Sequence, residues 1–324
     1  MTIAATQTFP GPAWDELPDV RVLESWPPQE QLPGVDVLLE AVVPVGPDEL
    51  RLLPDLRLVG NYGVGYDNVD VAACVERGIA VTNTPGVLDA AVAELTLALM
   101  LACRRQLVAS DRFVRDARWR TGWSRPERLG HDLAGATLGL VGMGRIGSEV
   151  GRRAKAFGMQ VVHHRRSDGL SLDELLRTSD VVSLHAPLTP ETQGLLSRER
   201  LALLRDGATL VNTARGAIVD ESALVDELVS GRISAGLDVF ADEPRVPERL
   251  LDLPNVVLTP HIAGSVGDEC RRMGRFMVDE LKRYLAGEKL QGLVTRDLAE
   301  RSSHRPVTVT VHAKSPKRVP KVAL

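Results

Sequence analysis

Three stretches of the chain each place a polar residue just after an apolar run. "LVNTARGAIVD" presents Arg215, "GLDVFADEP" presents Glu243 and "VVLTPHIAG" presents His261. An arginine can polarise a keto oxygen and hold a carboxylate, while a histidine can donate a proton as hydride arrives. A glutamate bonded to that histidine would fix the orientation of its ring. Any one of these residues alone is more often structural, but together they are the groups that reduction of a 2-keto acid needs.

A glycine-rich turn supplies the second chemical signal. In "LGLVGMGRIGSEV", Gly142, Gly144 and Gly147 have the G-x-G-x-x-G spacing of a dinucleotide-binding turn. The first glycine permits a tight turn, the second lets the backbone approach a pyrophosphate, and the third lets the helix pack on the strand. The motif follows a predicted strand and opens a predicted helix, so we predict a nucleotide cofactor rather than a structural turn.

The segment after the turn departs from the pattern of an NAD enzyme. Such an enzyme places an acid about 20 residues after the turn to hold the adenosine ribose. Here "MQVVHHRRSDG" places Arg165 at that position, 23 residues after Gly142, followed by Arg166 and Ser167. Arginines and a hydroxyl can donate to a 2′-phosphate, so we predict NADP(H) over NAD(H). The alternative is that these residues form a solvated turn.

These residues sit within two series of alternating strands and helices. The first includes apolar strands at 35–40, 56–60 and 79–83, a helix at 69–78 and a long apolar helix at 89–105. The second has strands at 137–142, 159–164, 180–185, 208–213, 233–240 and 255–260, with helices after the glycine turn, at 171–179 and at 221–231. Continuous Val, Leu and Ile runs separated by helices predict an α/β fold with parallel sheets covered on both faces.

Composition narrows the class of protein. The chain has 324 residues, 44% of them hydrophobic, and a net charge of −4, which favour about two globular domains and give no footprint for nucleic acid. Three widely spaced cysteines match neither a zinc site nor a disulfide framework, so no metal is predicted. The N-terminal segment lacks the pattern of a secretory signal, and the apolar run at 90–103 is too short to span a bilayer. We therefore expect a cytoplasmic protein with no membrane partner.

The order of the motifs resembles a known family. "GVGYDNVD", "AVAELTLALML", "LGLVGMGRIG", "HAPLTPET", "NTARGAIVD", "GLDVFADEP" and "TPHIAG" together look like the D-isomer-specific 2-hydroxyacid dehydrogenases, and most like their glyoxylate/hydroxypyruvate reductase branch. The similarity covers about residues 20–294. It implies an oxidoreductase that transfers hydride between a nicotinamide cofactor and a small 2-keto acid, giving the D-2-hydroxy acid.

The resemblance also implies roles for individual residues. Arg215, Glu243 and His261 match the family's catalytic trio, with His261 as the proton donor, and Asp238 matches the residue that meets the nicotinamide carboxamide. Gly63, Val64 and Gly65 match a loop whose backbone N–H groups hold the substrate carboxylate, beside Arg215 and His261. The remaining cofactor-contacting positions are Gly142, Gly144, Arg145, Ile146, Gly147, Arg165, Arg166, Ser167, Pro187, Thr192, Thr213 and Ala214.

The fold implied by the family is a Rossmann domain inserted into a smaller flavodoxin-like substrate domain. We place the substrate domain at residues 1–106 and 286–324 and the Rossmann NAD(P)-binding domain at 107–285. The family implies a homodimer that pairs through the Rossmann domains and the helix region at 90–104. Residues 301–324 carry six Lys or Arg and no acid. This basic tail falls outside the family pattern, and we expect either a mobile segment or a strand added to a sheet edge.

The sequence leaves alternatives for the substrate and for the functional class of the protein. Glyoxylate and hydroxypyruvate lead, because the chain lacks the long C-terminal extension of many phosphoglycerate dehydrogenases and has Glu243 where a formate dehydrogenase would be expected to differ. A phosphite dehydrogenase on the same scaffold is a further enzyme alternative. An alternative of another class is a dinucleotide-sensing corepressor, which shares the fold and the trio. In such a protein the six basic residues of the tail could contact a partner or nucleic acid.

Overall fold

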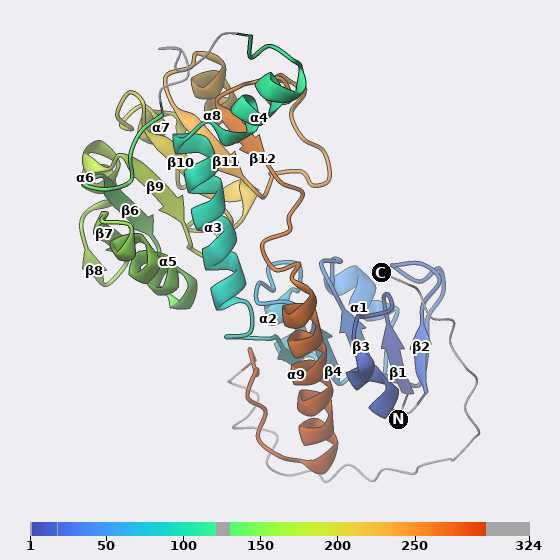
Figure 1. Ribbon diagram of the computed structural model, residues 1–324. Coiled ribbons are helices and arrows are strands. Elements are labelled where there is room, and N and C mark those ends of the chain that lie inside the picture. The colour runs from blue at the N-terminus through green and yellow to red at the C-terminus, as the bar shows by residue number, and fades with distance from the viewer. Residues whose placement is uncertain (1, 18, 121–129, 296–324) are drawn as a thin grey trace. The chain divides into compact units, whose positions relative to one another are not determined.

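The computed structural model describes residues 2–17, 19–120 and 130–295, and it divides the chain into two compact units. The first unit combines Met1–Pro85 with the segment that starts at Arg271, and the second is Gly86–Cys270 (Figure 1). Each unit contains a mainly parallel sheet with helices, so the predicted α/β class is confirmed. The basic tail lies outside the described residues. No helix among the described residues combines the length and apolar character needed to span a membrane.

In its described residues, the first unit holds a five-stranded parallel sheet in the order β2-β1-β3-β4-β5. Its strands are β1 (Thr2–Ala5), β2 (Val20–Val22), β3 (Val35–Glu40), β4 (Leu58–Asn61) and β5 (Ala80–Thr82), and its helices are α1 (Pro47–Arg51), α2 (Val71–Glu76) and most of α9 (Gly267–Ala286). One face packs on α9, where Met277 and Leu281 join Ile3, Val37 and Leu58 in one apolar cluster.

Among residues 86–120 and 130–270, the second unit holds a seven-stranded sheet in the order β12-β11-β10-β9-β6-β7-β8, in which only β8 is antiparallel to its neighbour. The strands are β6 (Thr137–Val141), β7 (Gln160–Arg165), β8 (Asp168–Gly169), β9 (Val181–Leu184), β10 (Thr209–Asn212), β11 (Ser234–Leu237) and β12 (Val256–Leu258). The helices are α3 (Asp89–Arg104), α4 (Leu107–Arg115), α5 (Arg145–Ala156), α6 (Leu172–Thr178), α7 (Arg198–Leu201) and α8 (Glu221–Val229).

Helices cover both faces of this second sheet. Helices α3 and α5 share one apolar cluster with β6, β9 and β10, and α6, α7 and α8 share another with the opposite face. The continuous apolar strands predicted from the sequence follow from this burial on both sides, since the central strands β6, β9, β10 and β11 are almost entirely buried.

Two helices, α3 and α9, lie in other units than the domain boundaries expected at residues 106 and 286 would place them. Helix α3 contacts α5, β10 and β11, so its apolar residues are buried on the second sheet and the division falls near residue 85. From Arg271 onward, α9 belongs to the first unit because its apolar residues pack on β1, β3 and β4. In each case the side chains of the helix determine which sheet it joins.

Candidate functional site

The predicted site residues of the second unit gather at the carboxyl edge of its sheet. Strand β6 has β7 on one side and β9 on the other, so the chain winds away from β6 in both directions (Figure 1). Ligands of open α/β sheets bind outside the carboxyl ends of the strands at such a switch point. The glycine turn follows β6, and the polar loops follow β7, β9, β10, β11 and β12. All of these segments therefore leave the same edge.

The glycine turn has the geometry that a dinucleotide requires. Gly142 has φ of 100°, and a Cβ there would lie 2.7 Å from the carbonyl carbon and oxygen of His185. A Cβ on Gly147 would lie 2.2 Å from the oxygen of Gly142, whereas one on Gly144 would meet nothing within 4 Å. Gly144 is also the residue before α5, whose first residues are Arg145 and Ile146. Open space against backbone N–H groups at a helix start fits a pyrophosphate.

The end of β7 carries more than the predicted basic residues. The Nε of Arg165 donates to Ser167 Oγ at 3.0 Å and lies 2.9 Å from Oδ1 of Asp168. Nη2 of Arg166 lies 3.9 Å from Oε2 of Glu191. Asp168 was not predicted from the sequence, where its signal is the "SDG" turn that folds β8 back onto β7. Arg165, Arg166 and Ser167 thus lie together where the ribose acid of an NAD enzyme would stand, with acids beside both arginines.

The loops after β9 and β10 hold the next predicted residues in place. Thr192 Oγ1 donates to the carbonyl of Pro187 at 2.6 Å, which closes the loop after β9. Thr213 is buried, with its hydroxyl 2.9 Å from that of Thr96 on α3.

Arg215 ends a tightly bonded turn. Asn212 accepts a hydrogen bond from the N–H of Ala214 and donates one to the carbonyl of Arg215. The Arg215 guanidinium donates to the Ala214 carbonyl at 2.7 Å. A Cβ on Gly216 would lie 2.0 Å from the Phe240 carbonyl carbon. The absent side chain therefore lets the Arg215 turn approach the loop that carries Glu243.

Glu243 and His261 form a direct pair. Nδ1 of His261 lies 2.7 Å from Oε2 of Glu243, and both side chains are about one-third exposed. Oε1 of Glu243 accepts a hydrogen bond from the Phe240 N–H at 3.0 Å. Burial opposes ionisation of Glu243, but the bonds from His261 and Phe240 and the charge of Arg215 lower its pKa below the usual value. Glu243 is therefore ionised at neutral pH, so His261 donates through Nδ1 and its Nε2 is left for other chemistry.

Asp238 holds the loop that presents His261. Its carboxylate is fully buried and accepts hydrogen bonds from the Thr259 hydroxyl and the N–H groups of Ile262 and Ala263. Its carbonyl accepts the N–H of His261, which has a left-handed φ of 52°. Asp238 therefore holds residues that precede and follow His261 in the chain, which are Thr259, Ile262 and Ala263. The predicted contact of Asp238 with a nicotinamide carboxamide remains a prediction.

Comparison with known proteins places this architecture in a family. Residues 97–263 match the model of the D-isomer specific 2-hydroxyacid dehydrogenase NAD binding domain. The chain is 42% identical to a glyoxylate reductase of Korarchaeum cryptofilum over 285 residues, which are 84% of this chain and 86% of the relative. The chain belongs to the D-isomer-specific 2-hydroxyacid dehydrogenase family. The resemblance drawn from the motifs is confirmed.

Two further relatives resemble this dehydrogenase over most of its length. A hydroxypyruvate reductase of Thermotoga maritima is 40% identical over 267 residues, covering 78% of this chain and 86% of the relative. The crystal structure of an NADPH-dependent glyoxylate/hydroxypyruvate reductase from Sinorhizobium meliloti, in complex with NADP and malonate, aligns with a TM-score of 0.82 and 34% identity, covering 90% and 96% of the two chains. The chain thus has the NAD-binding domain of an oxidoreductase family.

The "GVG" loop of the dehydrogenase lies in the first unit, after β4. Asn61 donates to the carbonyl oxygens of Gly63 and Gly65, and Asn83 donates to that of Val64. The N–H of Gly63 donates to the Asn61 carbonyl at 3.0 Å. These bonds fix the loop within its own unit. That its N–H groups hold a substrate carboxylate remains a prediction.

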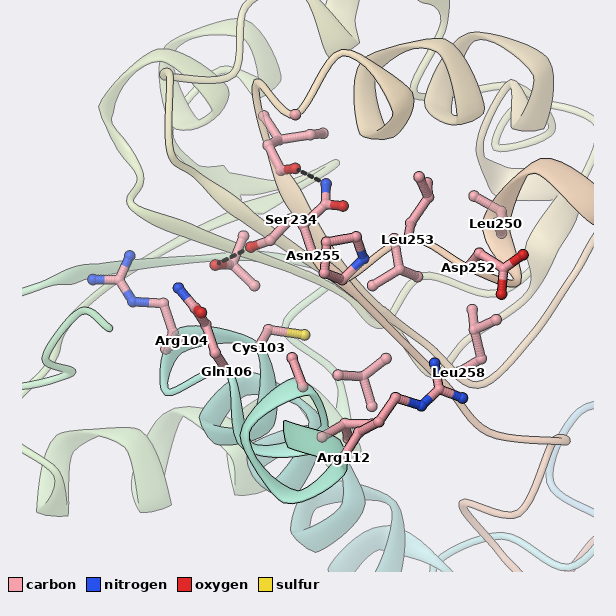
Figure 2. Close-up of a pocket in the computed structure, with 18 of the residues that line it drawn as sticks. Cys103, Arg104, Gln106, Arg112, Ser234, Leu250, Asp252, Leu253, Asn255 and Leu258 are labelled. Atoms are coloured by element: carbon pink, nitrogen blue, oxygen red, sulfur yellow. Dashed lines mark hydrogen bonds between the residues drawn. The ribbon is translucent and has the colours of Figure 1, made fainter. Parts of the chain in front are cut away.

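A cavity of about 700 Å³ opens at the other end of the second sheet (Figure 2). Its walls include Thr209, Ser234 and Val256, which are the first residues of β10, β11 and β12, together with Cys103 and Arg112. Ser234 shares a hydrogen bond with Thr209 at 2.9 Å. Because Arg215, Glu243 and His261 follow the carboxyl ends of the same strands, this cavity lies apart from the candidate active site of the dehydrogenase.

Proposed function

We propose that the enzyme reduces a small 2-keto acid, glyoxylate or hydroxypyruvate, to the D-2-hydroxy acid with NADPH. The observation that carries the proposal is the His261–Glu243 hydrogen bond, located at the sheet edge from which the glycine turn also leaves. A proton donor and a dinucleotide turn on one edge are what hydride transfer to a ketone needs. The similarity to glyoxylate and hydroxypyruvate reductases supports this substrate class.

In the proposed chemistry Arg215, His261 and Glu243 act on different parts of the reaction. When bound, the nicotinamide supplies the hydride. Arg215 binds the substrate carboxylate and polarises the keto oxygen. His261, protonated on both nitrogens, gives the proton of Nε2 to the oxygen that becomes the hydroxyl. Glu243 holds the Nδ1 proton throughout, which fixes the ring and stabilises its cationic form.

The proposed preference for NADP(H) is supported by the groups at the end of β7. Arg165 and Arg166 carry positive charge, and Ser167 adds a hydroxyl, at the position where an NAD enzyme has an acid. Guanidinium groups bind phosphate through charge-assisted hydrogen bonds, so a 2′-phosphate gains contacts here that a ribose hydroxyl does not.

A panel of 2-keto acids assayed with NADPH and NADH in parallel tests the proposal. We expect the highest kcat/KM with glyoxylate or hydroxypyruvate and NADPH. Preference for NADH would refute the cofactor assignment alone. No turnover of any 2-keto acid, with dinucleotide still bound, would refute the reaction and favour a sensing role. Inclusion of phosphite, formate and 3-phosphoglycerate, with oxidised cofactor, separates the other dehydrogenase alternatives.

The proposed assembly is a homodimer, as the family resemblance implies. Helix α4 of the second unit offers apolar side chains to an interface, because Leu107, Val108 and Val114 are each about half exposed and exposed apolar surface favours association. Light scattering on the purified protein tests it: a dimer mass is expected, and Val114→Asp should shift the equilibrium toward monomer. A monomeric wild-type protein at micromolar concentration would refute this assembly.

A further inference from the structure

An acid stands beside Arg165 at the point where the sequence lacks one. Strand β8 runs antiparallel to β7 and pairs Asp168 directly with Arg165. The N–H of Leu170 donates to the His163 carbonyl at 2.9 Å, which closes the turn. Gly169 has φ of 94°, and a Cβ there would lie 2.2 Å from the same carbonyl oxygen. The backbone therefore fixes Asp168 in register opposite Arg165.

Three neighbouring side chains converge on the Asp168 carboxylate. Arg165 Nε lies 2.9 Å from Oδ1, Ser167 Oγ donates to Oδ1 at 3.1 Å, and His163 Nε2 lies 3.4 Å from Oδ2. Arg165 and Ser167 are two of the groups that the proposed function assigns to a 2′-phosphate. The carboxylate and the guanidinium are each about half exposed, so both remain accessible to a ligand.

We propose that Asp168 is a cofactor-specificity residue that weakens NADP(H) binding and preserves NAD(H) binding. This inference rests on the proposed placement of the adenosine ribose at the end of β7. There Asp168 competes with a 2′-phosphate for Arg165 and Ser167, and its negative charge repels the phosphate. The same carboxylate can accept hydrogen bonds from the ribose hydroxyls. In NAD enzymes an acid at the end of the strand that corresponds to β7 does this.

The second arginine has a similar arrangement. Arg166 lies 3.9 Å from Glu191, whose carboxylate also accepts the Thr189 hydroxyl at 2.8 Å. Each arginine at this site therefore faces a carboxylate from a neighbouring segment. The longer separation at Arg166 makes Asp168 the stronger competitor, and hence the residue to change.

Equilibrium binding of two nucleotides to Asp168→Asn tests the proposal without turnover. Adenosine 2′,5′-bisphosphate reports the phosphate contact, and 5′-AMP reports the unmodified ribose. Asparagine keeps the shape and an oxygen acceptor but removes the charge. We expect the ratio of the two dissociation constants to shift by about fivefold toward the bisphosphate, which is the size expected for loss of one exposed ion pair. The kcat/KM ratio of NADPH to NADH should move in the same direction.

Asp111→Asn is the matched control. Asp111 forms an exposed ion pair of 2.7 Å with Arg115 on α4, so the substitution changes net charge equally at a distant place and should leave both affinities unchanged. An unchanged or reduced bisphosphate preference in Asp168→Asn would overturn the proposal, because Asp168 would then be neutral or would position Arg165 for the phosphate. A wild-type preference for 5′-AMP would contradict the NADP(H) assignment instead, while the shift in the variant would still decide the role of Asp168.

Discussion

His261 Nδ1 lies 2.7 Å from Glu243 Oε2, and this bond joins the loop after β12 to the loop after β11. Glu243 Oε1 also accepts the Phe240 N–H, so one oxygen of the carboxylate holds the loop while the other meets the imidazole. His261 is held from the other side by Asp238, whose carbonyl accepts its N–H. The ring is thus oriented by two acids from one loop, one through the side chain and one through the backbone.

Glu243→Gln should reduce turnover strongly while preserving the fold. The amide keeps the shape but removes the charge that stabilises a protonated imidazole, so we expect kcat to fall by about 100-fold, within the usual range for general acid catalysis. Steady-state kinetics with the preferred keto acid measures it, with Glu248→Gln on the neighbouring surface as the control. Because the pKa of Glu243 lies below its usual value, wild-type activity should not decline on protonation of Glu243 until the pH is well below neutral. A Glu243→Gln enzyme within threefold of wild type would exclude the pair from the mechanism.

His261→Asn removes the proton donor at a position with unusual backbone geometry. Asparagine is chosen because it tolerates left-handed φ values better than most residues, and His261 has φ of 52°. We expect a loss of at least about 100-fold in kcat, since the general acid is removed, with dinucleotide affinity unchanged in a fluorescence titration. Near-normal turnover would show that another group donates the proton.

The sequence was most informative where local pattern and tertiary structure agree. The strand expected at 35–40 is β3, and the helix expected at 171–179 contains α6, whose N-terminus is capped by Ser171 accepting the Glu174 N–H. That the polar loops share one edge of the sheet follows from the parallel topology predicted from the sequence, because every strand that precedes such a loop ends on the same side. Local sequence therefore predicted the strands that carry the site loops, which are β6, β7, β9, β10, β11 and β12.

Relationships that depend on distant packing were not predictable in this way. The sequence did not reveal α9 as a helix of the first unit, because its Met277 and Leu281 select a sheet that begins at residue 2. It did not pair Asp168 with Arg165, since that contact depends on the register of a two-residue strand. Nor did the sequence show that the Asp238 carboxylate is already bonded to the loop around His261.

Two glycines of the nucleotide turn should respond differently to alanine. Gly142→Ala places a Cβ 2.7 Å from the His185 backbone at φ of 100°, so we expect a loss of about 1–3 kcal/mol in stability as well as loss of dinucleotide binding. Gly144→Ala meets nothing within 4 Å and should keep the wild-type Tm while dinucleotide affinity falls. Thermal unfolding and nucleotide titration separate the two. Unchanged affinity in Gly144→Ala would show that no phosphate approaches this backbone.

Glu40 should make the protein less stable as pH rises. Its side chain is fully buried at the end of β3, and Oε2 accepts a hydrogen bond from Asn68. Burial raises its pKa from 4.5 to about 7. Between these values the folded protein holds a proton that the unfolded chain has lost, so stability falls with rising pH across this interval and the loss stays constant above it.

Glu40→Gln removes this ionisation, so the variant should gain stability over wild type by an amount that grows from pH 5 to pH 8. The gain should reach about 3 kcal/mol, given the free energy of a pKa shift from 4.5 to about 7. Urea unfolding at four pH values measures it. Glu280→Gln is the contrasting variant, because the buried Glu280 carboxylate accepts hydrogen bonds from Arg283 and from the N–H groups of Gln291 and Gly292, and its neutralisation should destabilise the protein. A Glu40→Gln effect that is the same at every pH would show that Glu40 does not ionise in this range.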